Sequence, residues 1–554
     1  MKKKEKFNKD IEPDEIFLDS TNLSAFNTQQ FEGWLEKPIS KSAIYITSVF
    51  FLIIISIYLS KLWTLQVING QSYADRSAQN SFKQIPFIPD RGNIYDSKDK
   101  LLAWNEEKDR VYVSEAGVSS LLGYLGFPSQ EELDNGLVSN PKDLVGKEGM
   151  EKKFNDILRG EDGILIAEVD VKGNIQSEGI LDYGKNGESL YLSLDLDLSK
   201  KLYETIGQLA NEKKFQGGAG TLMNVETGEI LAFASYPEYD SNVMTKRDNN
   251  KKINSYITDS KMPFLNRVIS GLYLPGSILK PIFALAALNE GIISENKEIY
   301  SAGFISIPNP YSPDKPTIFK DWKAHGYVDM RKALAFSSDV YFYAIGGGYE
   351  DQKGLGIANI EKYSRLFGLG TTTGINFGKE EIGNIPSPAW KASVFNGEKW
   401  NIGNTYHSSI GQYGFQVTPI QIVRAIGAIA NNGKLIEPTF LKRQKEITPY
   451  SLINISEDKF KIIKEGMRKS ATEGTASGLY FPQVNVVAKT GTAEVGTLKQ
   501  FVNSWVVGFF PYENPKYAFT VVMERGPVAN TVGGVYVMRE LFNWMIENRS
   551  EYIK

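Results

Sequence analysis

Serine and lysine are the side chains from which this sequence would have to build a nucleophilic site. The chain contains no cysteine and only two histidines, His325 and His407. The lack of cysteine removes thiolate nucleophiles, disulfides, cysteine-ligated zinc and cysteine-held iron–sulfur clusters. A serine becomes a useful nucleophile when a base takes its proton, and a desolvated lysine can be that base. We therefore begin with serines at helical spacing from a lysine.

Ser277 and Lys280 are the leading pair of this kind. They stand in the segment 274–281, LPGSILKP, where Pro-Gly ends an extended approach and the apolar run IFALAAL begins a helix. Pro281 is tolerated in the first turn because the N–H groups there have no intrahelical partner. Residues three apart share a helix face, so the lysine amine can reach the serine hydroxyl. The helix N-terminus also offers free N–H groups to a developing oxyanion.

The same Ser-x-x-Lys spacing occurs four more times, in polar stretches that predict surface pairs. These copies are Ser97/Lys100, Ser294/Lys297, Ser312/Lys315 and Ser456/Lys459. Only the copy at residue 277 has a turn before it and a helix of buried type after it. Spacing alone leaves a chance pair as the alternative interpretation.

A second candidate segment is Lys489-Thr490-Gly491-Thr492, which follows a strand-like run ending at Ala488. Because side chains alternate along a strand, Thr490 and Thr492 share one face and can both hydrogen-bond one substrate carboxylate. Gly491 lets another backbone approach closely, and Lys489 adds the positive charge that an anion needs. A phosphate-binding loop is disfavoured, since the required upstream glycine is absent. An edge strand with ordinary threonines is the alternative.

Ser337 and Asp339 form a third candidate, in a turn between the helix-like RKALAF and the apolar VYFYAIGGG. Two polar side chains two residues apart in such a turn can point into one cleft. A simple helix cap is the competing interpretation, since serine and aspartate are favoured at that position.

Elements that could bring these three segments together are predicted at both ends of the soluble region. A helix over 199–214 precedes a β-hairpin formed by GAGTLMNV, the turn 226–228 and EILAFASY. The C-terminal end adds the strand-like runs VNVVAKTG, SWVVGFF and YAFTVVME, and a closing helix over 532–548. These strands enclose a mostly helical middle, residues 275–473. We therefore predict an α+β domain whose antiparallel sheet is built from both ends and flanked by helices.

Residues 42–60, between Lys41 and Lys61, carry no charge and predict a membrane-spanning helix. The run is roughly 28 Å long as a helix, close to the ~30 Å hydrocarbon core. It is apolar all round, which excludes an amphipathic surface helix. A buried core helix is the alternative, and the absence of an A-x-A site disfavours a cleavable signal peptide. The distribution of lysines leans towards a cytoplasmic N-terminus without deciding it.

Length and charge restrict what the rest of the chain can be. A single core stops growing near roughly 250–300 residues, so 554 residues predict at least two domains. The net charge of −3 gives no electrostatic argument for a nucleic-acid partner. From residue 63 to about residue 187, short strand-like runs alternate with polar turns, which is typical of an irregular, extended α+β region.

The three candidate segments, in this order, resemble the motif set of the penicilloyl-serine transferases: Ser277-x-x-Lys280, Ser337-x-Asp339 and Lys489-Thr490-Gly491. Further segments resemble class B penicillin-binding proteins, namely 91–96 (RGNIYD), 146–151 (GKEGME) and 266–281 (NRVISGLYLPGSILKP). Others are similar to the elongation-specific penicillin-binding protein 2 type, namely 319–323 (FKDWK) with His325-Gly326, 410–412 (IGQ), 418–421 (TPIQ) and the aspartate at 339. The resemblance covers roughly residues 45 to 545.

The resemblance implies a peptidoglycan DD-transpeptidase that cross-links stem peptides during cell-wall elongation and is a target of β-lactams. Ser277 would attack the penultimate D-Ala carbonyl, expel the terminal D-Ala and pass the acyl group to an amine of a neighbouring strand. Lys280 would be the base, and Ser337, near Lys489, would relay protons to the leaving group. It implies no metal and no cofactor, and a structural or recognition role for His325.

The resemblance also implies how the substrate is held. Thr490 and Thr492 would bind the terminal carboxylate of the stem peptide, with Gly491 between them. The backbone N–H groups of Ser277 and Thr492 would form the oxyanion hole. Asp339 departs from the asparagine common in the wider family: it can accept but not donate, and its charge can stabilise a protonated Lys280. The segment 97–100, SKDK, departs from the glycine turn that the family usually shows in its non-catalytic part.

Implied domains are a cytoplasmic tail (1–41), a transmembrane helix (42–62), an elongated pedestal resembling a dimerisation domain (63–195) and a penicilloyl-serine transferase domain (196–554). The catalytic domain would lie outside the cytoplasmic membrane, anchored by a single pass. There is no room for a glycosyltransferase domain before the pedestal, so polymerisation would fall to a partner. By family analogy, this partner is a membrane glycan polymerase of the shape, elongation, division and sporulation group.

Three alternatives compete with this interpretation. The nearest is the same reaction in division or sporulation, which the motif chemistry does not distinguish. A membrane β-lactam sensor would need a cytoplasmic signalling domain, which the short tail does not provide. A non-catalytic scaffold for wall assembly is disfavoured because all the reactive side chains are present.

Overall fold

A computed structural model describes residues 39–107, 109–135, 141–169, 174–309, 312, 314–375, 377–443, 448–496 and 498–553. Most of the predicted cytoplasmic tail, residues 1–38, lies outside the described residues. The chain divides into two compact units, Met1–Ile85 with Ile166–Gly179, and Pro86–Leu165 with Ile180–Lys554.

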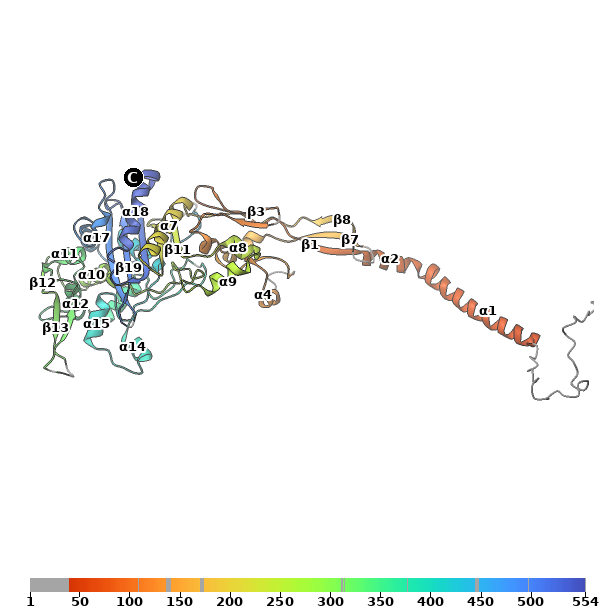
Figure 1. The fold of residues 1–554 in the computed structure, drawn as a ribbon, viewed down its shortest axis with the longest axis horizontal. Coiled ribbons are helices and arrows are strands. Elements are labelled where there is room, and N and C mark those ends of the chain that lie inside the picture. The colour runs from red at the N-terminus through yellow and green to blue at the C-terminus, as the bar shows by residue number, and fades with distance from the viewer. Residues whose placement is uncertain are drawn as a thin grey trace, which may run out of the picture. The chain divides into compact units, whose positions relative to one another are not determined.

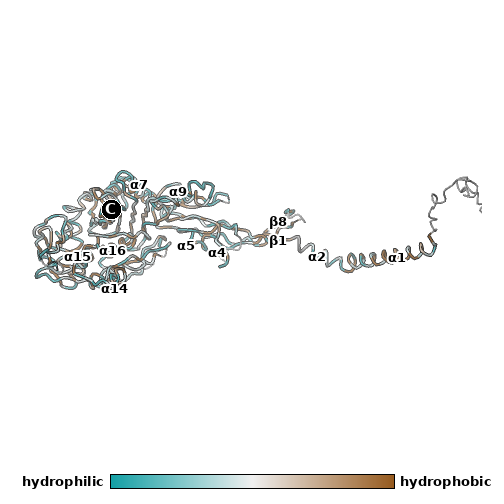
Figure 2. The backbone as a smooth tube through the Cα atoms, turned by 60° about the horizontal axis from the view of Figure 1, so that its bottom comes forward, coloured by the Kyte–Doolittle hydropathy of each residue, from teal (hydrophilic) through white to brown (hydrophobic). Residues whose placement is uncertain are grey.

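The first unit contains the apolar helix α1 (Lys41–Trp63), capped by the Ser40 hydroxyl, which accepts from the Ala43 N–H. It runs on through a π-helical turn, η3 (Thr64–Ile68), and is followed by α2 (Gly70–Ser81). The stretch Lys41–Ile68 is the one helix of the described residues that is long and apolar enough to cross a membrane. None of the α1 side chains is buried against protein, and hydrophobic residues recur along its length (Figure 2). This helix is consistent with a single-pass membrane anchor.

A three-stranded sheet, most of which belongs to the first unit, has the order β1–β7–β8. Its strands are β1 (Phe82–Phe87), β7 (Gly163–Val169) and β8 (Ile175–Asp182). The short strand-like runs expected between residues 63 and 187 include two of these strands, KQIPFI at 83–88 and GILIAEVDV at 163–171. Every residue of β8 is exposed, so this strand contributes little to a core.

The N-terminal part of the second unit is held together by a buried ion-pair cluster around Glu151. The Glu151 carboxylate is wholly buried, and its two oxygens lie 2.7 Å from Arg91 Nε and 2.7 Å from Arg110 Nε. Burial by itself raises the pKa of Glu151, but the two guanidinium groups outweigh it and hold the pKa below its usual value. The segments 91–96 and 146–151, which both carry the family resemblance, thus meet at this cluster.

The secondary structure of this part is short and irregular, as the sequence predicted. A four-stranded sheet has the order β4–β3–β2–β9, and β5 pairs with β6. The elements are β2 (Ile94–Tyr95), β3 (Leu101–Glu106), β4 (Asp109–Tyr112), α3 (Ser119–Leu122), β5 (Leu125–Gly126), α4 (Gln130–Asp134), β6 (Val145–Gly146), α5 (Gly149–Lys153), α6 (Asn155–Arg159) and β9 (Leu190–Tyr191).

The centre of the second unit is a five-stranded antiparallel sheet of order β11–β10–β20–β19–β18. Its strands are β10 (Gly217–Asn224), β11 (Ile230–Tyr236), β18 (Val487–Val495), β19 (Phe501–Phe510) and β20 (Tyr517–Pro527). Strand β10 pairs directly with β20, with Gly218 opposite Met523. The prediction of an antiparallel sheet built from both ends of the domain is therefore confirmed.

Helices cover both faces of this sheet. On one face pack α7 (Leu196–Glu212) and α18 (Gly534–Asn548), and on the other α16 (Pro419–Ala430) and α17 (Glu457–Thr472). Figure 1 shows α7, α17 and α18 around the strands β11 and β19. Alternation along β19 shows the two cores: Val506 packs with the α7 and α18 side chains, whereas Trp505 and Val507 pack with the helical middle. Helix α7 begins before the predicted residue 199 because the Asp195 carboxylate caps it, accepting from the N–H groups of residues 197 and 198.

The remaining elements form the helical middle and the small hairpins around it. The helices are α8 (Ser241–Lys246), α9 (Asn250–Thr258), η4 (Gly276–Leu279), α10 (Lys280–Asn289), α11 (Met330–Phe336), α12 (Asp339–Gly347), α13 (Gly356–Leu366), α14 (Pro388–Val394), α15 (Ile402–Ser409), η5 (Ser477–Leu479) and η6 (Ser550–Tyr552). The paired strands are β12 (Ile299–Ser301) with β15 (Gly326–Val328), β13 (Phe304–Ile307) with β14 (Thr317–Lys320), and β16 (Lys434–Ile436) with β17 (Tyr450–Leu452).

Arg267 ties the segment before Ser277 to the central sheet. Its side chain is wholly buried, and its Nε lies 2.7 Å from the Glu524 carboxylate at the end of β20. The two terminal nitrogens donate to the backbone carbonyls of Lys261 and Met262. Each nitrogen of the guanidinium group thus donates to an acceptor, and these bonds offset the cost of burying the charge.

We expect Arg267→Ala to lower the free energy of unfolding of the second unit by about 3–5 kcal/mol, because the substitution leaves the Glu524 carboxylate buried without its partner. Chemical denaturation followed by tryptophan fluorescence measures the loss. The matched control is Arg365→Ala, which removes an exposed pair with Glu361 within α13 and should cost under about 1 kcal/mol. Equal losses for the two variants would contradict the assignment.

Candidate active site

Ser277 lies in a short 3₁₀ turn, η4, that leads directly into α10. The residue before it, Gly276, has a φ of +59°, a left-handed conformation that favours glycine. Its N–H donates to the Gly411 carbonyl at 2.9 Å, and a side chain at Gly411 would collide with the Gly276 backbone. The two glycines therefore allow the loop at 411 to press on the turn and fix the position of Ser277, whose side chain remains partly exposed.

Lys280 is wholly buried, and its ammonium group is held by the turn that precedes α12. Nζ lies 2.6 Å from Asp339 Oδ1, 2.8 Å from the Ser337 carbonyl and 3.3 Å from Ser337 Oγ. The sequence placed Lys280 within reach of the Ser277 hydroxyl, but no hydrogen bond joins these two side chains among the described residues. The carboxylate of Asp339 is the stronger acceptor and draws the ammonium group to itself.

Ser337 is the point at which the two lysines meet. Its hydroxyl accepts from Lys489 Nζ at 2.8 Å as well as from Lys280. The residue has φ 59° and ψ 39° and terminates α11, whereas the neighbouring Ser338 caps α12 by accepting from the Tyr341 N–H. The helix-cap interpretation therefore holds for Ser338, while Ser337 and Asp339 both point into the cleft.

Lys489, on β18, is wholly buried and also donates to the Thr490 carbonyl at 2.8 Å. Burial and the nearby positive charge of Lys280 hold the pKa of Lys489 well below its usual value, although Asp339 acts in the opposite direction. A lowered pKa makes the Lys489 ammonium group a readier proton donor, and the Ser337 hydroxyl is one of the groups to which it donates.

The predicted alternation along β18 is present in the structure. Lys489 and Gly491 are buried, whereas Thr490 is partly exposed and Thr492 is exposed towards the cleft. A Cβ at Gly491 would lie 2.9 Å from the Pro275 carbonyl oxygen and 2.8 Å from an Ile278 methyl group. The strand thus packs with its backbone against the turn that carries Ser277, as predicted for a glycine at this position.

These side chains line one cleft of about 660 Å³ in the second unit. It contains Ser277, Ser337, Asp339, Thr490, Gly491 and Thr492, while Lys280 and Lys489 lie buried beneath it. Sequence reasoning missed several further lining residues, namely Trp322, Thr475, Ser504, Trp505, Tyr536 and Arg539. Thr475 accepts a hydrogen bond from the Thr490 hydroxyl at 2.7 Å, a contact between distant segments that no local pattern signals.

Neither histidine lines this cleft. Burial lowers the pKa of His325 and of His407 from the usual value, so both rings are mostly neutral at pH 7. His325 lies against Asp321 and the rings of Trp322 and Phe336, outside the group of residues that could react with a substrate.

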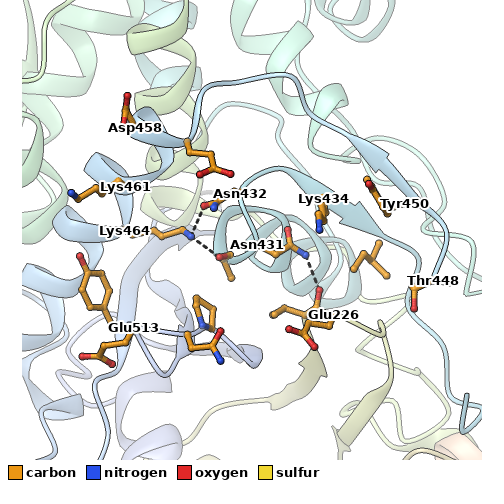
Figure 3. Close-up of a pocket in the computed structure, with 17 residues that line it drawn as sticks. Glu226, Asn431, Asn432, Lys434, Thr448, Tyr450, Asp458, Lys461, Lys464 and Glu513 are labelled. Carbon is orange, nitrogen blue, oxygen red and sulfur yellow. Dashed lines mark hydrogen bonds between the residues drawn. The ribbon is translucent and has the colours of Figure 1, made fainter. Parts of the chain in front are cut away.

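A second hollow, of about 790 Å³, lies between the ends of α16 and α17 and the β19–β20 turn (Figure 3). Its buried lysine, Lys464, donates to the Ala430 carbonyl at 2.6 Å and to Asn432 Oδ1 at 2.7 Å. Burial lowers the pKa of Lys464 to about 8. The lysine thus stabilises the C-terminal end of α16, where a positive charge is favourable. None of the predicted site residues lines this hollow.

Comparison with known proteins agrees with this geometry. Residues 218–543 match the Penicillin binding protein transpeptidase domain, and residues 104–192 match the Penicillin-binding Protein dimerisation domain. The peptidoglycan D,D-transpeptidase MrdA of Acinetobacter baumannii is 31% identical over 73% of this chain and 62% of its own length. The MrdA protein of Haemophilus influenzae is 25% identical over 93% of this chain and 95% of its own length.

A solved structure of penicillin-binding protein 2 from Helicobacter pylori, in complex with MreC, has a similar fold. Its TM-score is 0.71 at 28% identity, over 84% of this chain and 99% of that chain. The match to the transpeptidase domain alone covers more than half of the sequence. The chain therefore belongs to the penicillin-binding protein transpeptidase family, as a class B serine D,D-transpeptidase of peptidoglycan synthesis of the elongation-type penicillin-binding protein 2 group.

Proposed function

We propose that Ser277 is the nucleophile of this reaction and that it forms an acyl-enzyme with the penultimate D-Ala of a stem peptide. The observation that carries the proposal is the continuous polar chain from Asp339 through Lys280 and Ser337 to Lys489, in the cleft where Ser277 is exposed. Such a chain can take a proton from the attacking hydroxyl and return it to the leaving amine.

Lys280 is the base in this proposal, and Lys489 prepares it. In this relay a proton passes from Lys280 to Lys489 through the Ser337 hydroxyl, which lies within hydrogen-bonding distance of both amines. The neutral Lys280 then takes the Ser277 proton as Oγ bonds to the carbonyl carbon. When the tetrahedral intermediate collapses, Lys489 returns a proton through Ser337 to the departing D-Ala nitrogen, and the reverse sequence serves the incoming amine.

The strand β18 and the turn η4 would bind the two ends of the scissile unit. Thr490 and Thr492, which share the cleft face of β18, hold the terminal carboxylate. The backbone N–H groups of Ser277 and Thr492 receive the developing oxyanion. The short distance between Gly491 and Pro275 keeps these two groups together.

Asp339 takes the place of the amide-bearing residue common in the wider family. With Oδ1 at 2.6 Å from Lys280 Nζ, its carboxylate stabilises the protonated lysine before and after each proton transfer. Its side chain is one-fifth exposed and lines the cleft, so it would also lie beside a bound substrate.

We assign the domains as a cytoplasmic tail (1–41), a membrane span (42–62), a pedestal (63–195) and a transpeptidase domain (196–554). The catalytic domain acts outside the cytoplasmic membrane, because its substrate is there. The partner that supplies glycan strands is a membrane polymerase of the shape, elongation, division and sporulation group. Since the similar Helicobacter pylori protein was solved with MreC, a scaffold of that kind is a second candidate partner.

Acylation tests the nucleophile. We expect a fluorescent penicillin to form a stable covalent adduct with the protein and Ser277→Ala to abolish it, since no other hydroxyl can replace Oγ at the end of the proton relay. In-gel fluorescence and peptide mapping provide the measurement. The control is Ser294→Ala, which removes an exposed serine from another Ser-x-x-Lys pair and should leave labelling intact. Equal labelling of Ser277→Ala and wild type would reject the assignment.

The acceptor step requires a separate test. With polymerised lipid II and the polymerase present, we expect release of D-Ala together with cross-linked dimers, because the acyl-enzyme passes to an amine rather than to water. Chromatography of muramidase digests quantifies both products. Release of D-Ala without dimers would make the protein a carboxypeptidase.

The packing of β18 on η4 makes a third prediction. In Gly491→Ala the added methyl group must displace the Pro275 backbone or Ile278, so the nucleophile and the carboxylate site move apart. A misplacement of about 1 Å can cost on the order of 100-fold in rate, which we expect for acylation by penicillin. Gly179→Ala is the control, because a Cβ there meets no atom within 4 Å. Normal acylation of Gly491→Ala would show that the close approach is not needed.

A further inference from the structure

One short loop holds the chain on both sides of Ser337. On the N-terminal side, Trp322 Nε1 donates to the carbonyl of Phe336 at 3.3 Å. On the C-terminal side, Asp321 Oδ2 accepts from the Ser338 hydroxyl at 2.9 Å and from the Val340 N–H at 3.0 Å. Asp321 and Trp322 are adjacent in sequence, so a single segment fixes the residues that flank the relay serine.

Ser337 needs such support, because its backbone is in a left-handed conformation that non-glycine residues rarely adopt. With φ 59° and ψ 39°, it is held away from the helical region that its neighbours in α11 and α12 occupy. A residue keeps an unfavourable conformation only where the surrounding contacts over-determine it. The contacts of Asp321 and Trp322 are of this kind, and they lie outside the group of residues that exchange protons.

The Asp321 carboxylate is buried, and both of its oxygens accept hydrogen bonds. Its side chain is wholly buried, and its second oxygen accepts from the Trp322 N–H at 2.8 Å. Ser301 Oγ lies 3.4 Å from Oδ2, and His325 Nε2 lies 3.5 Å from Oδ1. The negative charge also faces the N-terminus of α12, where it is favourable. No other carboxylate among the described residues bonds to both the cap and the first turn of this helix.

We propose that Asp321 is a positioning residue for the transpeptidase reaction, acting through Ser338 and Val340. It holds the turn so that the Ser337 hydroxyl stays between Lys280 and Lys489 and the Asp339 carboxylate stays against Lys280. The inference rests on the proposed function, because it assigns the held groups their roles in proton transfer. Asp321 itself does not touch the substrate, since it does not line the cleft.

The test is Asp321→Asn, which keeps the size of the side chain but replaces one accepting oxygen with a donor. The amide cannot accept on both sides, so it loses either the bonds to Ser338 and Val340 or the bond to the Trp322 N–H. We expect the rate constant of acylation by penicillin to fall by about 10- to 100-fold, as for a small misplacement of reacting groups. The dissociation constant of the non-covalent penicillin complex should stay at the wild-type value.

Asp329→Asn is the matched control, because it makes the same chemical change at the cap of the preceding helix, α11. Asp329 Oδ1 accepts from the Lys332 N–H at 2.7 Å, a role that asparagine fills as well as aspartate. Both variants are compared below the onset of thermal unfolding of the full-length protein. Wild-type acylation in Asp329→Asn and slow acylation in Asp321→Asn support the proposal.

Two further measurements separate this proposal from the assignment of the nucleophile. Hydrogen exchange of the backbone N–H groups of residues 337–341 should be faster in Asp321→Asn than in the wild type. In a protein that already carries Ser338→Ala, Asp321→Asn should slow acylation by a smaller factor than it does alone. Any of three results would overturn the positioning role. These are faster hydrogen exchange with an unchanged acylation rate, effects of Asp321→Asn and Ser338→Ala on the acylation rate that are independent of each other, and a weaker non-covalent penicillin complex in Asp321→Asn. Failure of wild-type Ser277 to acylate, while exchange at 337–341 still responds to Asp321→Asn, would instead reject the proposed function.

Discussion

Two buried lysines that share one serine hydroxyl, but have only one carboxylate close by, are the constraint on which the second unit depends. Lys280 and Lys489 both donate to Ser337 Oγ, while Asp339 is in contact with Lys280 alone. Two ammonium groups at this distance in a dry site repel each other, and one carboxylate cannot compensate for both. The outcome is asymmetric: Lys280 keeps the counter-ion, and the pKa of Lys489 falls.

The fold can be understood as the scaffold that keeps these four groups together. They come from three segments distant in sequence. Lys280 lies at the start of α10, Ser337 and Asp339 lie where α11 meets α12, and Lys489 lies on β18. The central sheet fixes β18, because β18 pairs with β19, β19 pairs with β20, and β20 pairs with β10 from the N-terminal part of the domain. Arg267 then connects the end of β20 to the segment that leads into Ser277. A rigid sheet with glycine contacts at 276, 411 and 491 leaves the cleft little freedom to open at its base.

Much of this arrangement could be predicted from local pattern, and the reason is physical. The spacing of Ser277 and Lys280, the alternation of Thr490 and Thr492 and the uncharged run after Lys41 are properties of single elements, which sequence periodicity reports directly. The pairing of Asp339 with Lys280 was expected from the family resemblance and not from local pattern, since it depends on how α10 meets α12. The contacts of Thr475 and Asp321 are likewise long-range in sequence. The roles of the site residues remain predictions until the proton relay is tested.

The aspartate at 339 changes what the cluster can do. An asparagine there would remove the counter-ion that lies 2.6 Å from Lys280 Nζ. With a carboxylate, Lys280 is held in an ion pair, and in the proposed mechanism its proton leaves through Ser337. The orientation of the Ser337 hydroxyl then matters more here than in a site without that ion pair. In the proposed mechanism a proton crosses two hydrogen bonds, and it does so only while the Ser337 hydroxyl stays between Lys280 and Lys489. The contacts of Asp321 and Trp322 on both sides of residue 337 hold the left-handed backbone that places this hydroxyl.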